Sequence, residues 1–200
     1  ESAAIQPDSK RNIDDAASLQ SLRIEFTGAA LPGTPDELNG AGQTTTGTVI
    51  DIVDPDTVKP ALPLPQELES SLAPEAFIES DAPEIRAAAE RMVQGVTGVR
   101  ARAERLTREV NALVEKRPTV SLPSALEVLR TRVGDCNEHT VLLVAMARAL
   151  GIPARINVGV AYVHGAFYYH AWPEVYIDEG QGRGLWLPVD PTFNQFPADA

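Results

Sequence analysis

The 200-residue sequence contains a single cysteine, only three histidines and 6% aromatic residues. One cysteine cannot form an intramolecular disulfide, and it cannot supply the paired ligands of a cysteine-based zinc site. The chain also lacks the run of about eighteen apolar residues that a membrane-spanning helix needs. Its 17 basic residues are outnumbered by 28 acidic ones, which gives a net charge of -11. Because such a chain repels a phosphate backbone, we expect no nucleic-acid partner.

The N-terminal part of the chain differs in composition from the rest. Residues 1–18 are polar and without periodicity, which predicts a disordered lead-in. Leu22–Phe26 and Thr48–Val53 have strand patterns, whereas four prolines between residues 60 and 74 predict an extended connector. We therefore expect residues 1–80 to form an extended, β-containing segment and linker before the main domain.

From Asp81 onward, helical periodicity is followed by strand periodicity. Asp81-Ala82-Pro83-Glu84 combines a capping residue, a proline in the first turn and an early acid, which predicts a helix start. The apolar spacing predicts further helices over residues 99–116, 124–130 and 136–150, and strands over residues 154–163, 167–177 and 185–189. Helices followed by an antiparallel sheet are typical of an α+β fold, here over residues 81–200.

Cys136 follows Gly134-Asp135, and Asp135 with Glu138 forms a carboxylate variant of the capping box. This pattern places Cys136 in the first turn of a helix, where free N–H groups and the helix dipole favour the reactive thiolate. Gly134 is expected to leave room for a substrate carbonyl, and the Cys136 N–H is expected to donate to an oxyanion. A buried structural cysteine is the alternative, but it usually lies on an apolar stripe rather than beside a cap. We therefore predict a nucleophile.

The general base for this thiol must come from the three histidines. His164 lies in a predicted hairpin turn and is expected to be exposed. His139 shares the helical turn of the cysteine and cannot easily straddle the sulfur, so we interpret it as a support or packing residue. His170 lies in mid-strand and shares one strand face with Tyr168 and Trp172. Because aromatic neighbours hold an imidazole rigidly, His170 is the predicted base.

Asp190 ends the next predicted strand, and Pro191 favours an extended conformation there. An adjacent antiparallel strand can place this carboxylate against the second ring nitrogen of His170 and fix its tautomer. Glu174 and Asp178 are alternative orienting carboxylates, although Glu174 lies two residues along the same strand and is expected to be too far from the ring. The predicted triad is Cys136, His170 and Asp190.

A metal site is the other hypothesis that these side chains allow. Its ligands would be Cys136, His139, His164 and His170. These residues lack any paired C-x-x-C or H-x-x-x-H spacing, so we rank a metal site below the thiol hypothesis. We expect no metal and no cofactor.

Four motifs resemble the bacterial transglutaminase-like superfamily. They are Gly134–His139, Arg148–Arg155, Tyr169–Val175 and Val189–Thr192. The resemblance runs in order from about Ser121 to Asn194, and the helical region from Asp81 is similar to the leading helices of that family. It implies a papain-like transglutaminase core in which Cys136 is the nucleophile, His170 the base and Asp190 the orienting carboxylate. Asp135, Glu138 and His139 are expected to support this site.

Two positions depart from the family pattern. Animal transglutaminases place a tryptophan upstream of the cysteine to help hold the oxyanion, whereas Trp172 and Trp186 both lie downstream here. The sequence therefore identifies no second oxyanion donor. Pro173 follows Trp172 and removes one ladder N–H, which predicts a bulge or a sheet edge.

The predicted chemistry is acyl transfer from an amide through a thioester, which passes to water or to an amine. We favour a peptidase or amidase acting on a peptide or protein, with Trp172, Tyr169 and Tyr162 either lining a peptide groove or packing in the sheet. Alternatives are a cross-linking transglutaminase, a non-catalytic peptide-binding module, or an arylamine N-acetyltransferase-like protein, for which the sequence offers no basic, glycine-rich cofactor pocket. Since residue 1 is glutamate, we expect a segment of a longer protein, exported and membrane-tethered outside this segment, on family analogy alone.

Overall fold

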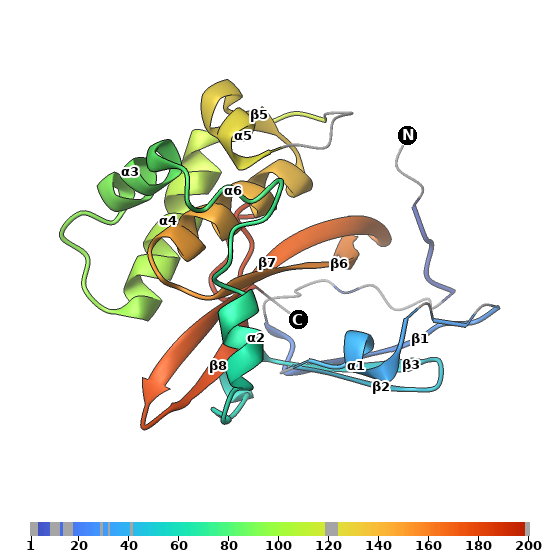
Figure 1. Cartoon of the computed structure of the whole chain (residues 1–200). Coiled ribbons are helices and arrows are strands. Elements are labelled where there is room, and N and C mark those ends of the chain that lie inside the picture. The colour runs from blue at the N-terminus through green and yellow to red at the C-terminus, as the bar shows by residue number, and fades with distance from the viewer. Residues whose placement is uncertain are drawn as a thin grey trace.

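The computed structural model describes residues 4–8, 13, 18–28, 30–31, 33–40, 42–118 and 124–198. Helices gather on one face of an antiparallel sheet, which confirms the predicted α+β fold (Figure 1). The helices of this main unit are α3 (Pro83–Met92), α4 (Val99–Leu113), α5 (Ala125–Thr131) and α6 (Cys136–Ala149). Its sheet contains β6 (Ala154–Val163), β7 (Ala166–Gly180) and β8 (Arg183–Pro188).

The strand order β6-β7-β8 makes β7 the central strand, with both neighbours antiparallel to it. β6 pairs with the N-terminal and middle parts of β7, so that Gly159 lies opposite His170. β8 pairs only with β7 residues from Glu174 onward. One side of His170 is therefore left without a β8 neighbour, and the chain that follows β8 lies there.

Pro173 does not cause the predicted bulge. It pairs in regular register with Ile156 of β6, and the register shift of β7 lies between Asp178 and Gly180. The Pro173 carbonyl oxygen accepts the Val189 N–H at 3.0 Å, so the missing N–H of Pro173 faces the side on which β8 has just ended. The register pairs of β8 end at Glu174, so the missing N–H of Pro173 lies just beyond the last of them.

Helix α6 is the centre of the core. Its residues from Glu138 to Ala149 are all buried, because β7 covers one side and α3, α4 and α5 cover the others. A helix that is apolar on nearly every side belongs in the interior, and small residues such as Ala145 and Ala147 let neighbouring elements approach closely. The first turn of α6, which carries Cys136, is consequently held by packing along the whole helix.

The helix predicted to start at Asp81 is α3, but the predicted cap is wrong. Ala82 is the N-cap residue and makes no side-chain capping hydrogen bond. Pro83 in the first turn and Glu84 beside the helix N-terminus remain as the start signals. The short helix after residue 123 is confirmed as α5, which Ser124 caps by accepting the Glu127 N–H.

Helix α4 ends at Leu113 rather than at the predicted Lys116. Residues Glu115–Lys116 (β4) instead pair in parallel with Val133–Gly134 (β5). A two-residue parallel pair between distant segments has no local sequence signature. The apolar spacing alone therefore predicted a helix that is longer than the one observed. The pairing fixes β5 directly before Cys136.

A second, smaller sheet lies N-terminal to the main unit, with strand order β1-β3-β2. Its elements are β1 (Ser21–Glu25), β2 (Gln43–Thr46) and β3 (Val49–Val53), with the short helix α1 (Pro35–Leu38) before β2. The strands β1 and β3 confirm the two strand predictions, whereas β2 lies in a stretch rich in glycine and was not predicted. In the predicted disordered lead-in, Ile5 pairs with Phe167 through backbone hydrogen bonds of 2.8 and 2.9 Å, so the prediction is wrong there. Residues 1–3, 9–12 and 14–17 of that lead-in lie outside the described residues.

Residues 58–80 run along the main unit, and we call this segment the strap. Instead of the predicted extended connector, the strap contains helix α2 (Pro65–Ser70), which begins with proline at N1 and lies beside β8 in Figure 1. Ala61 pairs with Gly184 at the outer edge of β8, and the Ser71 carbonyl oxygen accepts the Ala154 N–H at 2.9 Å. The strap therefore extends the hydrogen bonding of the sheet.

Two arginines of the main unit bind the strap. Arg148 is almost completely buried, and its NH1 donates to the Ala73 carbonyl oxygen and to Glu75 Oε1, both at 2.6 Å. Arg155 pairs with Glu67 of the strap and stacks on a tryptophan ring of β8. Because a buried guanidinium without its partners is costly, these contacts make the strap part of the folded unit.

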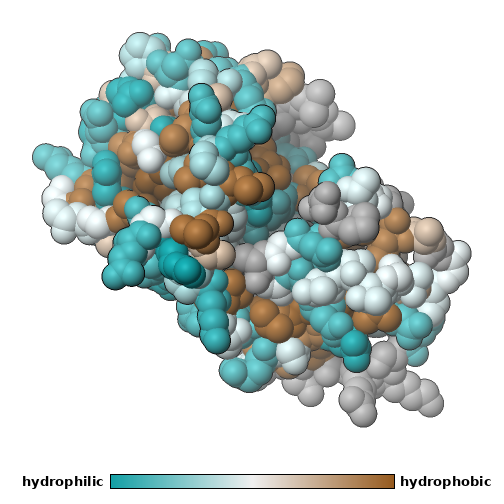
Figure 2. Space-filling model, turned by 60° about the horizontal axis from the view of Figure 1, so that its bottom comes forward, coloured by the Kyte–Doolittle hydropathy of each residue, from teal (hydrophilic) through white to brown (hydrophobic). Residues whose placement is uncertain are grey.

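Apolar side chains reach the surface on both the helical unit and the N-terminal sheet, which form two lobes in Figure 2. Leu62 and Leu64 of the strap and Val158 of β6 are the most exposed large apolar residues described, at 68%, 69% and 63%. Among the described residues, no helix combines the length and the apolar character that crossing a membrane requires.

Candidate active site

Cys136 is the first residue of α6 and directly follows β5. Asp135 and Glu138 form the predicted capping box, in which Glu138 Oε2 accepts the Asp135 N–H at 2.8 Å. A Cβ added to Gly134 would lie 2.1 Å from Glu138 Cβ. The cap therefore requires glycine at position 134, and the expected room for a substrate carbonyl stays a prediction.

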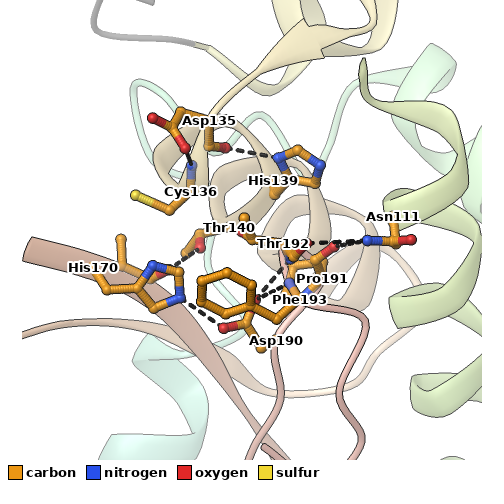
Figure 3. Close-up of polar contacts among 11 residues, drawn as sticks. Asn111, Asp135, Cys136, His139, Thr140, His170, Asp190, Pro191, Thr192 and Phe193 are labelled. Atoms are coloured by element: carbon orange, nitrogen blue, oxygen red, sulfur yellow. Dashed lines mark hydrogen bonds and ion pairs between the residues drawn. The ribbon is translucent and has the colours of Figure 1, made fainter. Parts of the chain in front are cut away.

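The backbone N–H of Cys136 is already engaged. It donates to Asp135 Oδ1 at 2.9 Å, whereas the sequence predicts that it is available for an oxyanion (Figure 3). Cys136 is 7% exposed, and its side chain lies beside the His170 ring. The site thus presents a thiol at a helix N-terminus without an obviously free backbone donor.

His170 of β7 is fixed by a carboxylate and by two aromatic rings. Its Nε2–H donates to Asp190 Oδ2 at 2.6 Å, which leaves Nδ1 for the thiol. The rings of Phe193 and Trp172 stack on the imidazole, with centroids 4.9 and 6.2 Å away. The residue is only 6% exposed, so the imidazole has one orientation, and the carboxylate favours a proton on Nε2.

The electrostatics of the site favour a protonated imidazole. Burial lowers the pKa of His170, but the hydrogen bond and charge of Asp190, together with the interaction with Cys136, raise it to about 9 from the ordinary 6.5. His170 therefore carries its second proton at neutral pH. An imidazolium beside a thiol stabilises the thiolate and can protonate a leaving group.

Asp190 lies just beyond β8, in a turn closed by backbone hydrogen bonds to Gln195 of 3.0 and 2.9 Å. Its Oδ1 accepts the N–H groups of Thr192 at 2.7 Å and Phe193 at 2.9 Å. The other carboxylate oxygen receives the His170 proton, and the residue is 3% exposed. Three donors thus hold the carboxylate in one orientation.

The structure rejects the two alternative orienting carboxylates. Glu174 Oε2 accepts from Arg155 Nε at 2.6 Å and does not contact His170. Asp178 is exposed and accepts the N–H of Gly180 at 2.7 Å in the β7–β8 turn. Among the described carboxylates, only Asp190 is hydrogen-bonded to the His170 ring.

A cleft of about 460 Å³ opens beside the thiol, lined by the start of α6, the β6–β7 hairpin and the Asp190 turn. Of the three predicted substrate-binding residues, Tyr169 lines this cleft and donates its O–H to Asn137 Oδ1 at 3.1 Å. Trp172 and Tyr162 do not line it. Trp172 packs over Gly159 and stacks on His170, and Tyr162 packs against another aromatic ring of the hairpin.

The other two histidines have the places that the sequence predicts. His139 is completely buried on α6, and its Nδ1–H donates to the Asp135 carbonyl oxygen at 2.7 Å, which ties the helix turn to the residue that caps it. His164 is an exposed turn residue with φ of 50° at the rim of the cleft. Within the described part of the chain, no three His, Cys, Asp or Glu side chains gather as a metal site would require.

Several residues that support the site carry no clear sequence signal. Asn111 of α4 donates through Nδ2 to the carbonyl oxygens of Pro191 at 2.7 Å and Thr192 at 3.2 Å, and so anchors the Asp190 turn (Figure 3). The sequence alone does not distinguish Asn111 from the polar residues on the solvent-exposed face of an amphipathic helix. Phe193 follows the Asp-Pro motif closely, but its contact with His170 depends on how the turn folds back.

Helices packed around a buried helix on an antiparallel sheet, with a cleft at the N-terminus of that helix, form a transglutaminase-like core. The family model of the transglutaminase-like superfamily matches residues 86–191. The chain belongs to this superfamily, which confirms the resemblance seen in the sequence motifs. A search of curated proteins returned no match.

Two solved structures share the fold at low sequence identity. A protein from Cytophaga hutchinsonii named "putative cysteine protease" is 22% identical, with a TM-score of 0.59, over 95% of this chain and 68% of its own. The periplasmic domain of TgpA from Pseudomonas aeruginosa is 21% identical, with a TM-score of 0.53, over 76% of this chain and 56% of its own. The chain therefore spans only part of the length of both.

Proposed function

We propose that this protein transfers acyl groups from amide bonds through a Cys136 thioester, and that water is the usual acceptor, which makes it a peptidase or amidase. The observation that carries the proposal is the 2.6 Å hydrogen bond from His170 Nε2 to Asp190 Oδ2, next to a thiol at a helix N-terminus. A carboxylate-oriented imidazole beside a thiol is the arrangement that activates a cysteine nucleophile.

In the proposed reaction, the Cys136 thiolate attacks the amide carbonyl carbon and a C–S bond forms. The C–N bond then breaks, and His170 gives its Nδ1 proton to the departing amine. Water attacks the thioester while His170 accepts its proton, and the free acid leaves as the thiolate is restored beside the protonated His170. An amine in place of water would give a new amide, which is the cross-linking alternative.

A peptide or protein substrate is supported by the shape of the cleft. It lies at the surface between α6 and the β6–β7 hairpin, and an aromatic side chain, Tyr169, is 54% exposed at its wall. Such a wall can pack against a substrate side chain while the main-chain amide reaches Cys136.

The test is a peptide and protein substrate screen with and without an added primary amine. Hydrolysis predicts a free acid and released amine or ammonia, lost in Cys136→Ala and His170→Ala but kept in His164→Ala, which removes a histidine of the cleft rim. Incorporation of the added amine as the main product would favour a cross-linking enzyme. A Cys136→Ala variant that keeps full biological function would favour a non-catalytic binding module.

We also propose that the protein acts outside the cytoplasm. The support is the likeness of fold to the periplasmic domain of TgpA. Fractionation of cells that carry the complete gene with an epitope tag tests this location, and recovery of the tag in the cytoplasm alone would contradict it.

A further inference from the structure

An acyl-transfer site needs hydrogen-bond donors for the oxyanion, and the structure leaves the second donor to be found. The Cys136 N–H donates to Asp135 Oδ1 at 2.9 Å. Neither tryptophan lines the cleft, since Trp172 stacks on His170 and Trp186 lies under the guanidinium of Arg155, 4.3 Å from it. A side-chain donor that lines the cleft must therefore be considered.

Asn137 is the cleft residue whose amide is best placed. It is the second residue of α6, directly after Cys136, and side chains in a helix lean toward its N-terminus, here toward the cleft. Its Oδ1 accepts the Tyr169 O–H at 3.1 Å. With the oxygen engaged, the Nδ2–H donors point away from Tyr169, and no described residue accepts from them. Thr192 also lines the cleft, but its Oγ1 is buried and out of reach of a ligand.

We propose that Asn137 Nδ2 donates a hydrogen bond to the oxyanion formed on Cys136, and that Tyr169 is the positioning residue that orients this amide. The inference rests on the proposed function, since it assigns a role within that reaction. A neutral amide suits the task because it donates without adding a charge that would compete with His170 for the thiolate.

The phenol of Tyr169 keeps its donor proton under working conditions. Partial burial and the negative charge of Cys136 both raise the pKa of Tyr169 above its usual value of 10. The O–H group therefore remains available to Asn137 Oδ1 at neutral pH. This hydrogen bond crosses from β7 to α6, so it also holds the two walls of the cleft together.

The test compares two reactions of the same thiol. Acylation by p-nitrophenyl acetate passes through a tetrahedral oxyanion, whereas alkylation by iodoacetamide forms none. Asn137→Ala and Asn137→Asp should slow acylation by about 10²-fold or more, the usual effect of losing one oxyanion donor, and leave alkylation by iodoacetamide within about twofold. Asn137→Asp is informative because its carboxylate still accepts from Tyr169 but offers no N–H.

Tyr169→Phe should slow acylation by about tenfold, as expected for losing one neutral hydrogen bond that orients the amide. The matched control is Tyr176→Phe, which removes a phenol on the same strand that packs against Trp186 and does not line the cleft, and it should leave both rates unchanged. Acylation at the wild-type rate in Asn137→Asp would overturn the inference, as would equal losses of acylation and alkylation in all three variants. A wild-type thiol that reacts no faster than free cysteine would instead contradict the proposed function itself. This outcome is distinct from a failure of the Asn137 inference alone.

Discussion

Replacing Asp190 by asparagine should lower the pKa of His170 and reverse its tautomer. The asparagine oxygen can still accept the N–H groups of Thr192 and Phe193, which Asp190 Oδ1 accepts at 2.7 and 2.9 Å. The Nδ2–H₂ group would then face His170 Nε2, where two donors would meet. The imidazole must therefore move its proton to Nδ1, the nitrogen that serves the thiol.

The size of the effect follows from the present environment of His170. Asp190 contributes both a hydrogen bond and a charge that raise the pKa to about 9 against the lowering effect of burial. Loss of a carboxylate partner at this distance typically lowers such a pKa by about 1–3 units, or roughly 1.4–4 kcal/mol. We therefore expect the titration midpoint of His170 to fall toward 6.5 or below.

The assay is a nuclear magnetic resonance titration of imidazole resonances, which is practicable because the chain has only three histidines. A His170→Gln variant identifies the resonance. Glu174→Gln is the matched control, since Glu174 is a buried carboxylate on the same strand that binds Arg155 and not His170. If the midpoint in Asp190→Asn stays at about 9, the carboxylate is not what holds the proton, and the reasoning is refuted.

Three further predictions concern stability. Since the pKa of His170 is raised to about 9, its protonation should add about 3 kcal/mol to the free energy of unfolding below pH 6.5, and this contribution should be lost as the pH rises through 9. In urea unfolding, the stability difference between wild type and His170→Gln should therefore shrink from pH 6.5 to 9. Gly134→Ala should destabilise the protein by about 1–3 kcal/mol, because the new Cβ would meet Glu138 Cβ at 2.1 Å; an unchanged urea midpoint would contradict the packing argument. Removal of residues 1–80 should lower the free energy of unfolding by about 3–5 kcal/mol more than removal of residues 1–57, because only the longer deletion removes the strap partners of Arg148. Equal thermal midpoints of the two deletions would show that the strap is dispensable.

The parts of the fold that the sequence predicts are those with strong local signals. Asp135 and Glu138 mark the start of α6, and the residues after Gly151 alternate in a way that only strands explain. The site residues His170 and Asp190 were predictable because each has a local reason for its conformation, mid-strand for one and before a proline for the other. Their hydrogen bond follows from the pairing of β7 with β8.

The features that the sequence does not predict depend on contacts between distant segments. The β4–β5 pair joins residues that are 18 positions apart, Glu115 and Val133, and is too short to have a pattern. The strap was predicted to be an extended connector because it is rich in proline. In the structure it contains a short helix, and Arg148 and the edge of β8 hold it in place. The Cys136 N–H was expected to be free. In the structure it donates to the capping residue Asp135, and the sequence does not show which N–H groups a capping aspartate binds.

The central claim, that Cys136 is a thiol activated for acyl transfer, is tested most directly by trapping its thioester. The protein is mixed with p-nitrophenyl acetate at pH 6, quenched with acid, and examined by intact mass and peptide mapping, with and without neutral hydroxylamine. We predict rapid acetylation of Cys136 that hydroxylamine removes, and a rate at least about tenfold lower in His170→Ala, because the imidazolium stabilises the thiolate. Acetylation of wild type and His170→Ala at the same slow rate, or on residues other than Cys136, would contradict the account.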